Sequence, residues 1–543
     1  MSFAVAILVA AACGFTALSY EILWFRIYSF ATGGSASSFG VLLGAYLAGI
    51  AFGSLVVWRW STDHAGAHAG AGAREGGRGP DGRPGSRAPA ALIVASNVAG
   101  FLLVPYVAWE VGLATFAFSL PAVAIASGLM GAVLPLVAHF GIAPDDRAGR
   151  RLSYLYLANI VGSATGSLLT GFVLMEHLPT GRISLVLLAL GLALGALLWT
   201  GVRPAARVAA LVAGIGLAAV AEPWLHGDLY ERLLFKERMV EGTRFARLIE
   251  NRSGVIAVRD DGAIFGGGMY DGFFNTDPAD NRNNVVRAYA LAAFRERTPE
   301  VLMIGLASGS WAQVLASAPG VDRLTVVEIN PGYVELIAEH AEVASILAGG
   351  KVEIAADDGR RWLLANPDRR FDAIVQNTTW YWRGHVTNLL SAEYMRIVKD
   401  HLKPGGVFYY NTNFGEDALK TGCSSFAHGF RLANFLALGD DPVTLDADRW
   451  RRALESWRID GRPVFDLALP FHRERLAAIL SAQPEPCAAV LERTREATVI
   501  TDDNMAGEWS RPWWVMPASD RIQARPEVPR EPQARAGEGE PTE

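Results

Sequence analysis

EVLMIGLASGSWAQVLASAPGVDRLTVVEIN, residues 300–330, decides the fold of the second half of this chain. It holds two short apolar runs rich in β-branched residues, EVLMI (300–304) and RLTVVEIN (323–330), and the segment between them is long enough for one helix. Parallel strands need such a crossover, which is usually helical. The stretch therefore predicts neighbouring strands of a parallel sheet covered by helices.

Three further runs continue this pattern downstream: KVEIA (351–355), FDAIVQ (371–376) and GVFYYNT (406–412). Helices are expected to begin near Trp311, at Pro331, near Gly359 and at Ser391, where Pro331 suits a first helical turn and Ser391 suits a cap. Five strands in this order predict a Rossmann-like α/β domain of the doubly wound type over residues 299–415.

The segments on either side of this domain have different patterns. GVIAVRDDGAIFGGGMYDG (254–272) predicts a β-hairpin that turns at Asp261-Gly262, so residues 226–298 are expected to form a linker and a small β subdomain. Residues 416–519 are expected to form a mostly helical C-terminal extension. Residues 520–543, rich in Pro, Glu and Arg, predict a disordered tail.

Residues 1–225 are expected to form a multi-span α-helical membrane bundle. Mean hydropathy is +0.21, only 19% of the residues are charged, and the first lysine is Lys236. About seven apolar segments are long enough to cross a bilayer, near 3–25, 37–58, 90–108, 112–142, 152–175, 183–200 and 207–222. The Gly/Ala/Arg-rich stretch 61–88 predicts a flexible loop.

Two ionisable residues, Glu21 and Arg26, lie at the end of the first span. Ionisable groups at membrane depth are costly and usually paired, so they indicate either a functional pair or an ion pair at the headgroup level.

Composition excludes some classes of partner and site. The formal charge is −6 and no dense basic stripe occurs, which argues against a nucleic-acid partner. Three cysteines are too few for a disulfide framework or a zinc cluster, although a Cys423–Cys487 bridge is left open. No metal is expected, and a homo-oligomer is left open.

Polar groups at three successive strand ends predict an adenosine-binding site. The first strand ends in GLASGS (305–310), where Gly305, Ser308 and Gly309 let the backbone pass close to a ligand. Glu328, about 20 residues on, can accept hydrogen bonds from both ribose hydroxyls. Asp357 and Asp358 follow the third strand, where they can meet the adenine amino group. A ligand-free structural turn is the alternative.

These motifs resemble the spermidine synthase family of aminopropyltransferases, in its bacterial branch fused to a membrane bundle. The resemblance rests on MYDGFFN (269–275), VLMIGLASGSW (301–311), LTVVEIN (324–330), DDGRRWL (357–363), FDAIVQN (371–377) and LKPGGV (402–407), and in the membrane half on SYEILWFR (19–26), GLMGAVLPL (128–136) and YLANIVGSATGSLLTGF (156–172). It implies transfer of the aminopropyl group of decarboxylated S-adenosylmethionine to an amine, leaving methylthioadenosine.

The acceptor side departs from the family pattern. Where the family has D-S-x-D-P after the fourth strand, this chain has Asn377 and Trp380, and neither can act as a base. The family's Asp-Gly pair survives as Asp271-Gly272, next to Tyr270, with Asn275 where a glutamine is usual. The family's acidic pair and Tyr-His-Glu cluster become DPADNRNNVVRAY (277–289). Ordinary putrescine is therefore not the expected acceptor.

Three functions remain open. In the first, a transferase binds a different amine, or a membrane-associated acceptor, under NTTWYWRGHVTN (377–388). Its catalytic residues would be Asn377 and His385, with His385 as base, and its substrate-binding residues would be Tyr270, Asp271, Asn275, Trp380, Arg383, Asp502 and Asp503. In the second, the domain is a catalytically degenerate sensor or transport module for an adenosyl metabolite. In the third, it transfers methyl groups from S-adenosylmethionine.

The charges of the loops and the implied cofactor predict opposite sides of the membrane for the α/β domain. Ten arginines lie in the second, fourth and sixth loops, against Arg26 and Arg182 on the other side, so the N-terminus is expected in the cytoplasm. Seven spans would then place the α/β domain outside, although the implied cofactor is a cytoplasmic metabolite. On chemical grounds we expect a multi-pass protein of the bacterial inner membrane whose soluble domain is cytoplasmic, with 207–222 as the span most open to miscounting.

Overall fold

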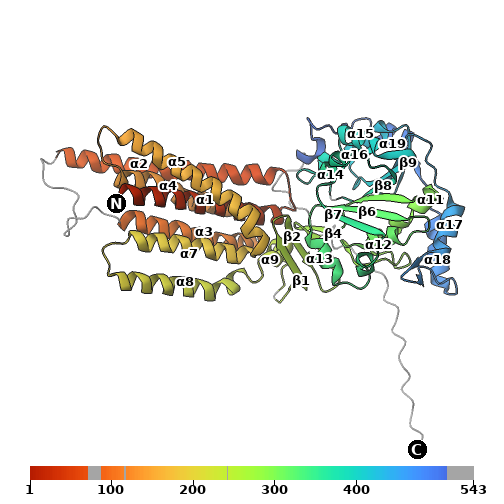
Figure 1. Cartoon of the computed structure of the whole chain (residues 1–543), viewed down its shortest axis with the longest axis horizontal. Coiled ribbons are helices and arrows are strands. Elements are labelled where there is room, and N and C mark those ends of the chain that lie inside the picture. The colour runs from red at the N-terminus through yellow and green to blue at the C-terminus, as the bar shows by residue number, and fades with distance from the viewer. Residues whose placement is uncertain (71–86, 115, 117, 241, 379, 510–543) are drawn as a thin grey trace, which may run out of the picture.

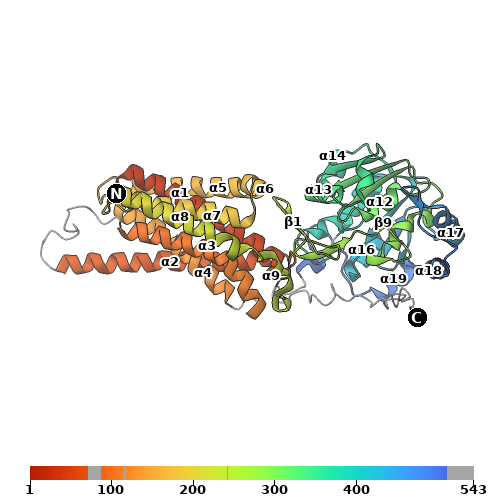
Figure 2. The same ribbon diagram turned by 90° about the horizontal axis from the view of Figure 1, so that it is seen from below.

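The computed structural model describes residues 1–70, 87–114, 116, 118–240, 242–378 and 380–509. A long helical bundle forms one end of the molecule and an α/β domain the other, with a small sheet between them (Figure 1). The chain's N-terminus lies at the end of the bundle that is farthest from the α/β domain (Figure 2).

Among the residues that the structure describes, seven helices are long and apolar enough to cross a membrane, in agreement with the predicted number. The bundle contains α1 (Phe3–Ala31), α2 (Ser37–Gly70), α3 (Arg87–Ala114), α4 (Ser119–Gly141), α5 (Ala148–Leu169), a π-turn and α6 (Met175–His177), α7 (Thr180–Leu198) and α8 (Pro204–His226). Glycines set its closest contacts: a Cβ on Gly53 would lie 1.9 Å from the carbonyl oxygen of Gly128, and one on Gly162 would lie 1.9 Å from that of Ala11.

Part of the predicted loop 61–88 is helical. α2 continues to Gly70 and α3 begins at Arg87, while residues 71–86 lie outside the described residues. Alanines favour helix, and their repeats in this stretch outweigh the glycines that suggested a loop.

A short helix, α9 (Leu229–Phe235), leads from the bundle to a four-stranded antiparallel sheet of order β1-β2-β3-β4. Its strands are β1 (Arg247–Asn251), β2 (Gly254–Val258), β3 (Ala263–Gly266) and β4 (Met269–Phe273). The predicted hairpin is its centre, and Gly262 has φ +83°, the left-handed conformation that glycine favours.

The main sheet has eight strands in the order β14-β10-β11-β9-β8-β5-β6-β7. Five are parallel, as predicted: β5 (Glu300–Ile304), β6 (Arg323–Glu328), β7 (Val352–Ala356), β8 (Phe371–Gln376) and β9 (Leu402–Asn411). The strand order reverses beside β5, and ligands of such sheets bind at the carboxyl ends of the strands at that point. The fold is therefore a Rossmann-like α/β domain behind a helical bundle.

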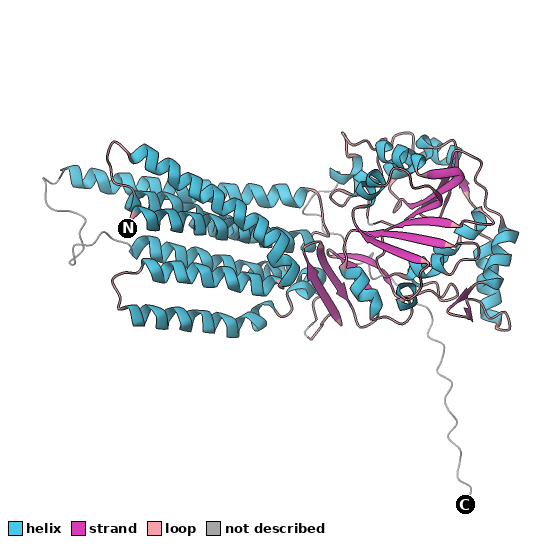
Figure 3. Ribbon diagram, in the orientation of Figure 1, coloured by secondary structure: helices cyan, strands magenta, loops and turns pink. Residues whose placement is uncertain are grey.

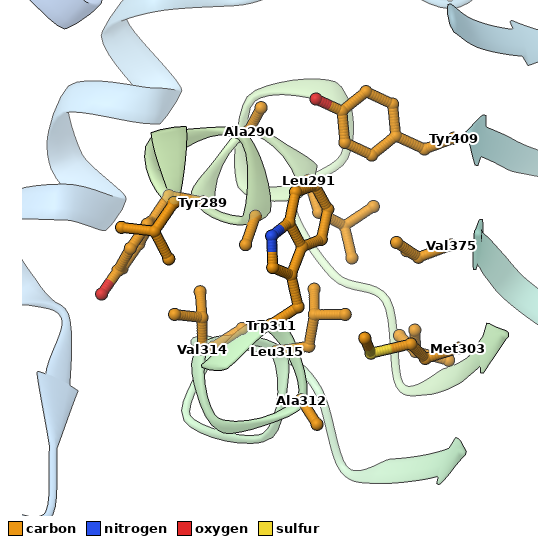
Figure 4. Close-up of a cluster of buried hydrophobic side chains, with 14 of the residues drawn as sticks. Tyr289, Ala290, Leu291, Met303, Trp311, Ala312, Val314, Leu315, Val375 and Tyr409 are labelled. Carbon is orange, nitrogen blue, oxygen red and sulfur yellow. The ribbon is translucent and has the colours of Figure 1, made fainter. Parts of the chain in front are cut away.

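Helices cover both faces of this sheet (Figure 3). They include α10 (Val286–Tyr289), α11 (Leu291–Phe294), α12 (Ser310–Ala316), α13 (Gly332–Ala338), α14 (Gly359–Ala365), α15 (Ala392–Asp400) and α16 (Glu416–Ser425). Ser391 caps α15 by accepting a hydrogen bond from the Tyr394 N–H, as predicted. On one face Trp311 lies within a cluster that includes Met303, Val375 and Tyr409 (Figure 4).

The sheet extends beyond the predicted boundary at residue 415. β10 (His428–Leu432) and β11 (Phe435–Gly439) form an antiparallel hairpin beside β9, and β14 (Glu485–Pro486) pairs with β10. The extension also contains α17 (Ala447–Ser456), the short strands β12 (Arg458–Ile459) and β13 (Arg462–Pro463), α18 (Pro470–Leu480) and α19 (Cys487–Arg493). A disulfide joins Cys423 in α16 to Cys487 in α19, which settles the pairing that the sequence left open. Residues 510–543, including the predicted tail, lie outside the described residues.

Candidate functional site

The loop after β5 lies where the strand order reverses. Gly305 has φ +92°, and a Cβ there would lie 2.7 Å from the Asn377 carbonyl oxygen. Gly309 has φ +74° and directly precedes α12. Any larger residue at Gly305 would push the ends of β5 and β8 apart, so glycine is required for this close approach.

Glu328 closes this loop from the end of β6. Its side chain is 5% exposed, and its carboxylate accepts hydrogen bonds from the N–H groups of Leu306 (2.6 Å) and Asn330 (2.8 Å). Burial raises the pKa of Glu328 to about 7, against the opposing effect of these two hydrogen bonds. The predicted ribose-binding carboxylate and the glycine loop are therefore in direct contact.

The two aspartates after β7 lie beside this strand end. The Asp357 N–H donates to the Glu328 carbonyl oxygen at 3.0 Å. Asp358 caps α14 by accepting from the Arg361 N–H at 2.8 Å, and Asp357 forms an ion pair with the exposed Arg361 side chain. The three strand ends that the sequence marked as an adenosine site thus lie side by side at one edge of the sheet.

Asp271 joins the small sheet to this edge. Its carboxylate accepts a hydrogen bond from the hydroxyl of Tyr333 in α13, a residue that the sequence did not single out. Burial raises the pKa of Asp271, against the opposing effects of the Tyr333 hydroxyl and of the positive charge of Arg383. A buried carboxyl group beside a glycine loop is suited to binding a cationic ligand group.

Asn377 belongs to a chain of hydrogen-bonded amides. Its Oδ1 accepts from Asn411 Nδ2 at 3.0 Å, and Asn411 Oδ1 accepts from Asn434 Nδ2 at 2.6 Å. Asn434 Oδ1 in turn accepts from Arg287 Nη1 at 2.6 Å. Where the family expectation is a base, this site has a chain of neutral amides that ends on an arginine.

Two predicted site residues hold the protein's own loops. The Ser308 hydroxyl donates to Ser310 Oγ (3.1 Å), which donates to the Phe273 carbonyl oxygen (2.8 Å). The Asn275 amide is bonded to Asp277 and Arg282 in its own loop. These contacts fix β4 against the glycine loop, and the expected substrate contact of Asn275 stays a prediction. Tyr270 packs near Phe265 and Phe273 in the small sheet.

The loop after β8 contacts the helical bundle. Arg383 forms a backbone bridge with Ser35 in the loop between α1 and α2, and burial lowers the pKa of its guanidinium while Asp271 opposes that shift. Trp382 is buried, with its ring 3.4 Å from where a Cβ on Gly33 would lie. Trp382 is therefore a packing residue, while Trp380 is half-buried and its substrate-binding role stays a prediction.

His385 is exposed, with φ +69°, and its backbone N–H donates to Glu508 at 2.7 Å. Its predicted role as base stays a prediction. Asp502 is held by Arg360 through two hydrogen bonds (2.8 and 2.6 Å) and by the Ser391 hydroxyl, and Arg360 lowers the pKa of Asp502. Asp502 thus joins α14 to α15, and Asp503 is exposed to solvent. The expected acceptor contacts of both residues stay predictions.

No protein-family profile matches the chain. It is similar to the polyamine aminopropyltransferase of Mycobacterium tuberculosis (strain ATCC 25618 / H37Rv), 24% identical over 307 residues, which are 52% of this chain and 56% of that protein. The chain thus matches only about half the length of that relative. Polyamine aminopropyltransferase 2 of Streptomyces coelicolor is 26% identical over 427 residues, 74% of this chain and 71% of the relative. That match covers more than residues 226–543 comprise, so it extends into the helical bundle.

Solved structures of spermidine synthase are also similar. One, in complex with the transition-state analogue AdoDATO, is 16% identical and covers 44% of this chain and 90% of its own, with a TM-score of 0.33. The enzyme from Thermotoga maritima is 15% identical over 44% of this chain and 89% of its own, with a TM-score of 0.32. The fold is a bundle of long apolar helices joined to a Rossmann-like α/β domain. By its curated relatives, the chain is related to the polyamine aminopropyltransferases.

Proposed function

We propose that this protein is a membrane-anchored transferase that moves the aminopropyl group of decarboxylated S-adenosylmethionine to an amine other than putrescine. The observation that carries this proposal is the contact between Glu328 and the Leu306 N–H, with Asp271 close by. This arrangement supports binding of a ribose at Glu328 and of a cationic donor near Asp271.

The reaction requires a neutral amine nitrogen in line with the carbon beside the sulfonium. The nitrogen lone pair forms the new C–N bond, the C–S bond breaks, and sulfur keeps its electron pair in methylthioadenosine. The amine then loses a proton. Asn377 cannot take that proton, which supports an acceptor with a lower amine pKa or a base on the 380–385 loop, where His385 is the candidate.

Calorimetry of the full-length protein in detergent micelles tests the donor. Decarboxylated S-adenosylmethionine and methylthioadenosine should bind, and Glu328→Ala should weaken both by about 100-fold, because two hydrogen bonds to a charged group are lost. Preferred binding of S-adenosylmethionine would support methyl transfer instead. Mass spectrometry with a panel of amines then tests for products heavier by one aminopropyl group. Spermidine formed from putrescine at an ordinary rate would refute the proposed acceptor class.

A second candidate is an adenosyl-metabolite sensor or transport module without turnover. The observation in its favour is the backbone bridge between Ser35 and Arg383, because it joins the bundle directly to a loop of the candidate site. Tight donor binding without any aminopropyl product would support this candidate over the transferase.

The proposed location is a bacterial inner membrane, with the bilayer as partner of the seven apolar helices. The proposed donor is a cytoplasmic metabolite, and this supports a cytoplasmic location of the α/β domain. The loop arginines, the seven spans and the Cys423–Cys487 disulfide support the opposite side. A domain outside the cytoplasm would meet the donor only after its export, and this holds for the transferase and the sensor candidate alike.

A further inference from the structure

A cavity of about 270 Å³ opens near the turn between β10 and β11. Its walls come from α10 and the loop before it, that turn, α17 and α18. They include two arginines and no acidic residue among the described residues that line it: Pro278, Asn281, Arg287, Ala433, Trp450 and Arg475 are the ones that matter here. The cavity therefore has a positive, partly apolar wall.

Arg287 is built firmly into this wall. Its Nη1 donates to Asn434 Oδ1 (2.6 Å), Nη2 to the Asn283 carbonyl oxygen (2.7 Å) and Nε to that of Asn284 (2.9 Å). Its guanidinium also lies 5.2 Å from the ring centre of Phe435. These bonds use three of its five N–H donors and fix its orientation.

No carboxylate neutralises Arg287 among the described residues. It contacts two backbone carbonyls, one amide and two aromatic rings, and burial lowers its pKa. A half-buried guanidinium without a carboxylate partner is stabilised by an anion that completes the site. Trp450 adds an indole N–H without a partner in the described part of the chain.

The same arginine is connected to the proposed acceptor side. The amides of Asn434 and Asn411 join it to Asn377, and its charge acts on Tyr270. It also lies in the segment 277–289, where the spermidine synthase resemblance leads one to expect an acidic cluster. This segment keeps Asp277 and Asp280, but it places the positive charge of Arg287 at the end of the amide chain that begins at Asn377.

We infer that the acceptor carries an anionic group, a carboxylate or a phosphate, that pairs with Arg287 and is assisted by Arg475, while its apolar chain lies against Trp450. This inference rests on the proposed transferase function. α17 and α18 lie on the side of the α/β domain away from the bundle (Figures 1 and 2), so the ligand is a water-soluble molecule rather than a lipid in the bilayer.

Matched ligands test this inference on the full-length protein in detergent micelles. By calorimetry, 5-aminopentanoate or 3-aminopropyl phosphate should bind at least about ten-fold more tightly than 1,5-diaminopentane, the gain expected from one charge-assisted hydrogen bond. The comparison of 5-aminopentanoate with 3-aminopropyl phosphate shows whether the site prefers a carboxylate or a phosphate. Tighter binding of the diamine would overturn the inference.

Substitutions of single arginines test which residues bind the anionic group of the ligand. Arg287→Gln should abolish the preference, and Arg475→Gln should weaken anion binding by roughly three-fold because Arg475 is exposed. Arg473→Gln on the same helix should leave anion binding unchanged, because Arg473 does not line the cavity. An unchanged preference in Arg287→Gln would overturn the inference. If Arg287→Gln fails to fold, judged by its melting curve, Arg475→Gln decides alone. Anion binding is measured with and without methylthioadenosine. This comparison distinguishes a protein that does not bind the adenosyl group from one that does not bind the anion in this cavity.

Discussion

The backbone N–H of Gly384 donates a hydrogen bond of 2.8 Å to the carbonyl oxygen of Gly34. Gly34 belongs to the loop between the first two helices of the bundle, and Gly384 follows Arg383 in the loop after β8. Since Arg383 acts electrostatically on Asp271, the bundle supports one wall of the candidate site. A substitution in the bundle at this contact is therefore expected to affect the α/β domain, and a substitution in the α/β domain is expected to affect the bundle.

Gly34→Ala tests this contact. Gly34 has φ +79°, and a Cβ there would lie 2.9 Å from Arg383 Nε. We expect a loss of stability of about 1–2 kcal/mol from backbone strain, with a further loss from the displaced guanidinium. Gly461→Ala is the matched control, because Gly461 has the same φ of +79° with no atom within 4 Å of the added Cβ. Thermal unfolding and methylthioadenosine binding are the measurements, and equal effects of both variants would contradict the proposed support.

A buried ion pair forms a second junction between bundle and small sheet. Arg26 near the end of α1 lies 3.7 Å from Glu250 in β1, with side chains 7% and 10% exposed, and it donates to the Asn251 carbonyl oxygen. Glu250 also accepts from the Tyr230 hydroxyl at 2.8 Å. This pairing favours the ion-pair interpretation of Arg26, although its partner is Glu250 and not Glu21.

Arg26→Met should destabilise the protein by about 3 kcal/mol, because it leaves the buried Glu250 carboxylate without its cation. Arg252→Gln removes a pair between the same two parts, Arg252 with Glu176 at 3.6 Å, whose side chains are 55% and 32% exposed. That control should cost less than about 1 kcal/mol. Urea unfolding in detergent measures both, and a smaller effect for Arg26→Met than for the control would refute the assigned role.

Glu328 predicts a pH dependence of adenosyl binding. Its folded-state pKa of about 7 lies above the ordinary value of 4.5, so its contribution to the stability of the ligand-free protein is fully present below 4.5 and is lost as the pH rises through about 7. Ribose hydroxyls need the ionised carboxylate as acceptor. Methylthioadenosine should therefore bind about ten-fold more tightly at pH 8 than at pH 6. Glu328→Gln should bind weakly at both pH values, and a pH dependence that persists in this variant would assign the titration to another group.

The sequence predicted the parallel strands, the apolar spans and the hairpin of the small sheet, but not the antiparallel strands after residue 415. β5 and β8 begin and end at the predicted residues, because apolar β-branched runs flanked by polar residues are local signals. β11 was missed because Leu436, Ala437 and Leu438 are good helix formers, and pairing with β9 overrides that preference.

The candidate site divides in the same way. Glu328 was predicted from its spacing after the glycine loop, which is a local signal. Tyr333 and Arg287 were not singled out, since their importance depends on contacts with Asp271 and Asn434 that no local pattern contains. The contact of Gly34 with Gly384 joins segments from opposite halves of the chain, and no spacing rule connects them.

The last prediction concerns the side of the membrane. The N-terminus and the loops that carry Arg147 and Arg203 lie at the end of the bundle away from the α/β domain (Figure 1), and arginine-rich loops face the cytoplasm. The Cys423–Cys487 disulfide also fits an oxidising compartment. We therefore expect alkaline phosphatase fused after Glu543 to be active and a green fluorescent protein fused there to be dark, with the reverse in the loop near Arg147. A fluorescent C-terminal fusion together with reduced Cys423 and Cys487 would instead place the α/β domain in the cytoplasm, where the proposed donor is expected.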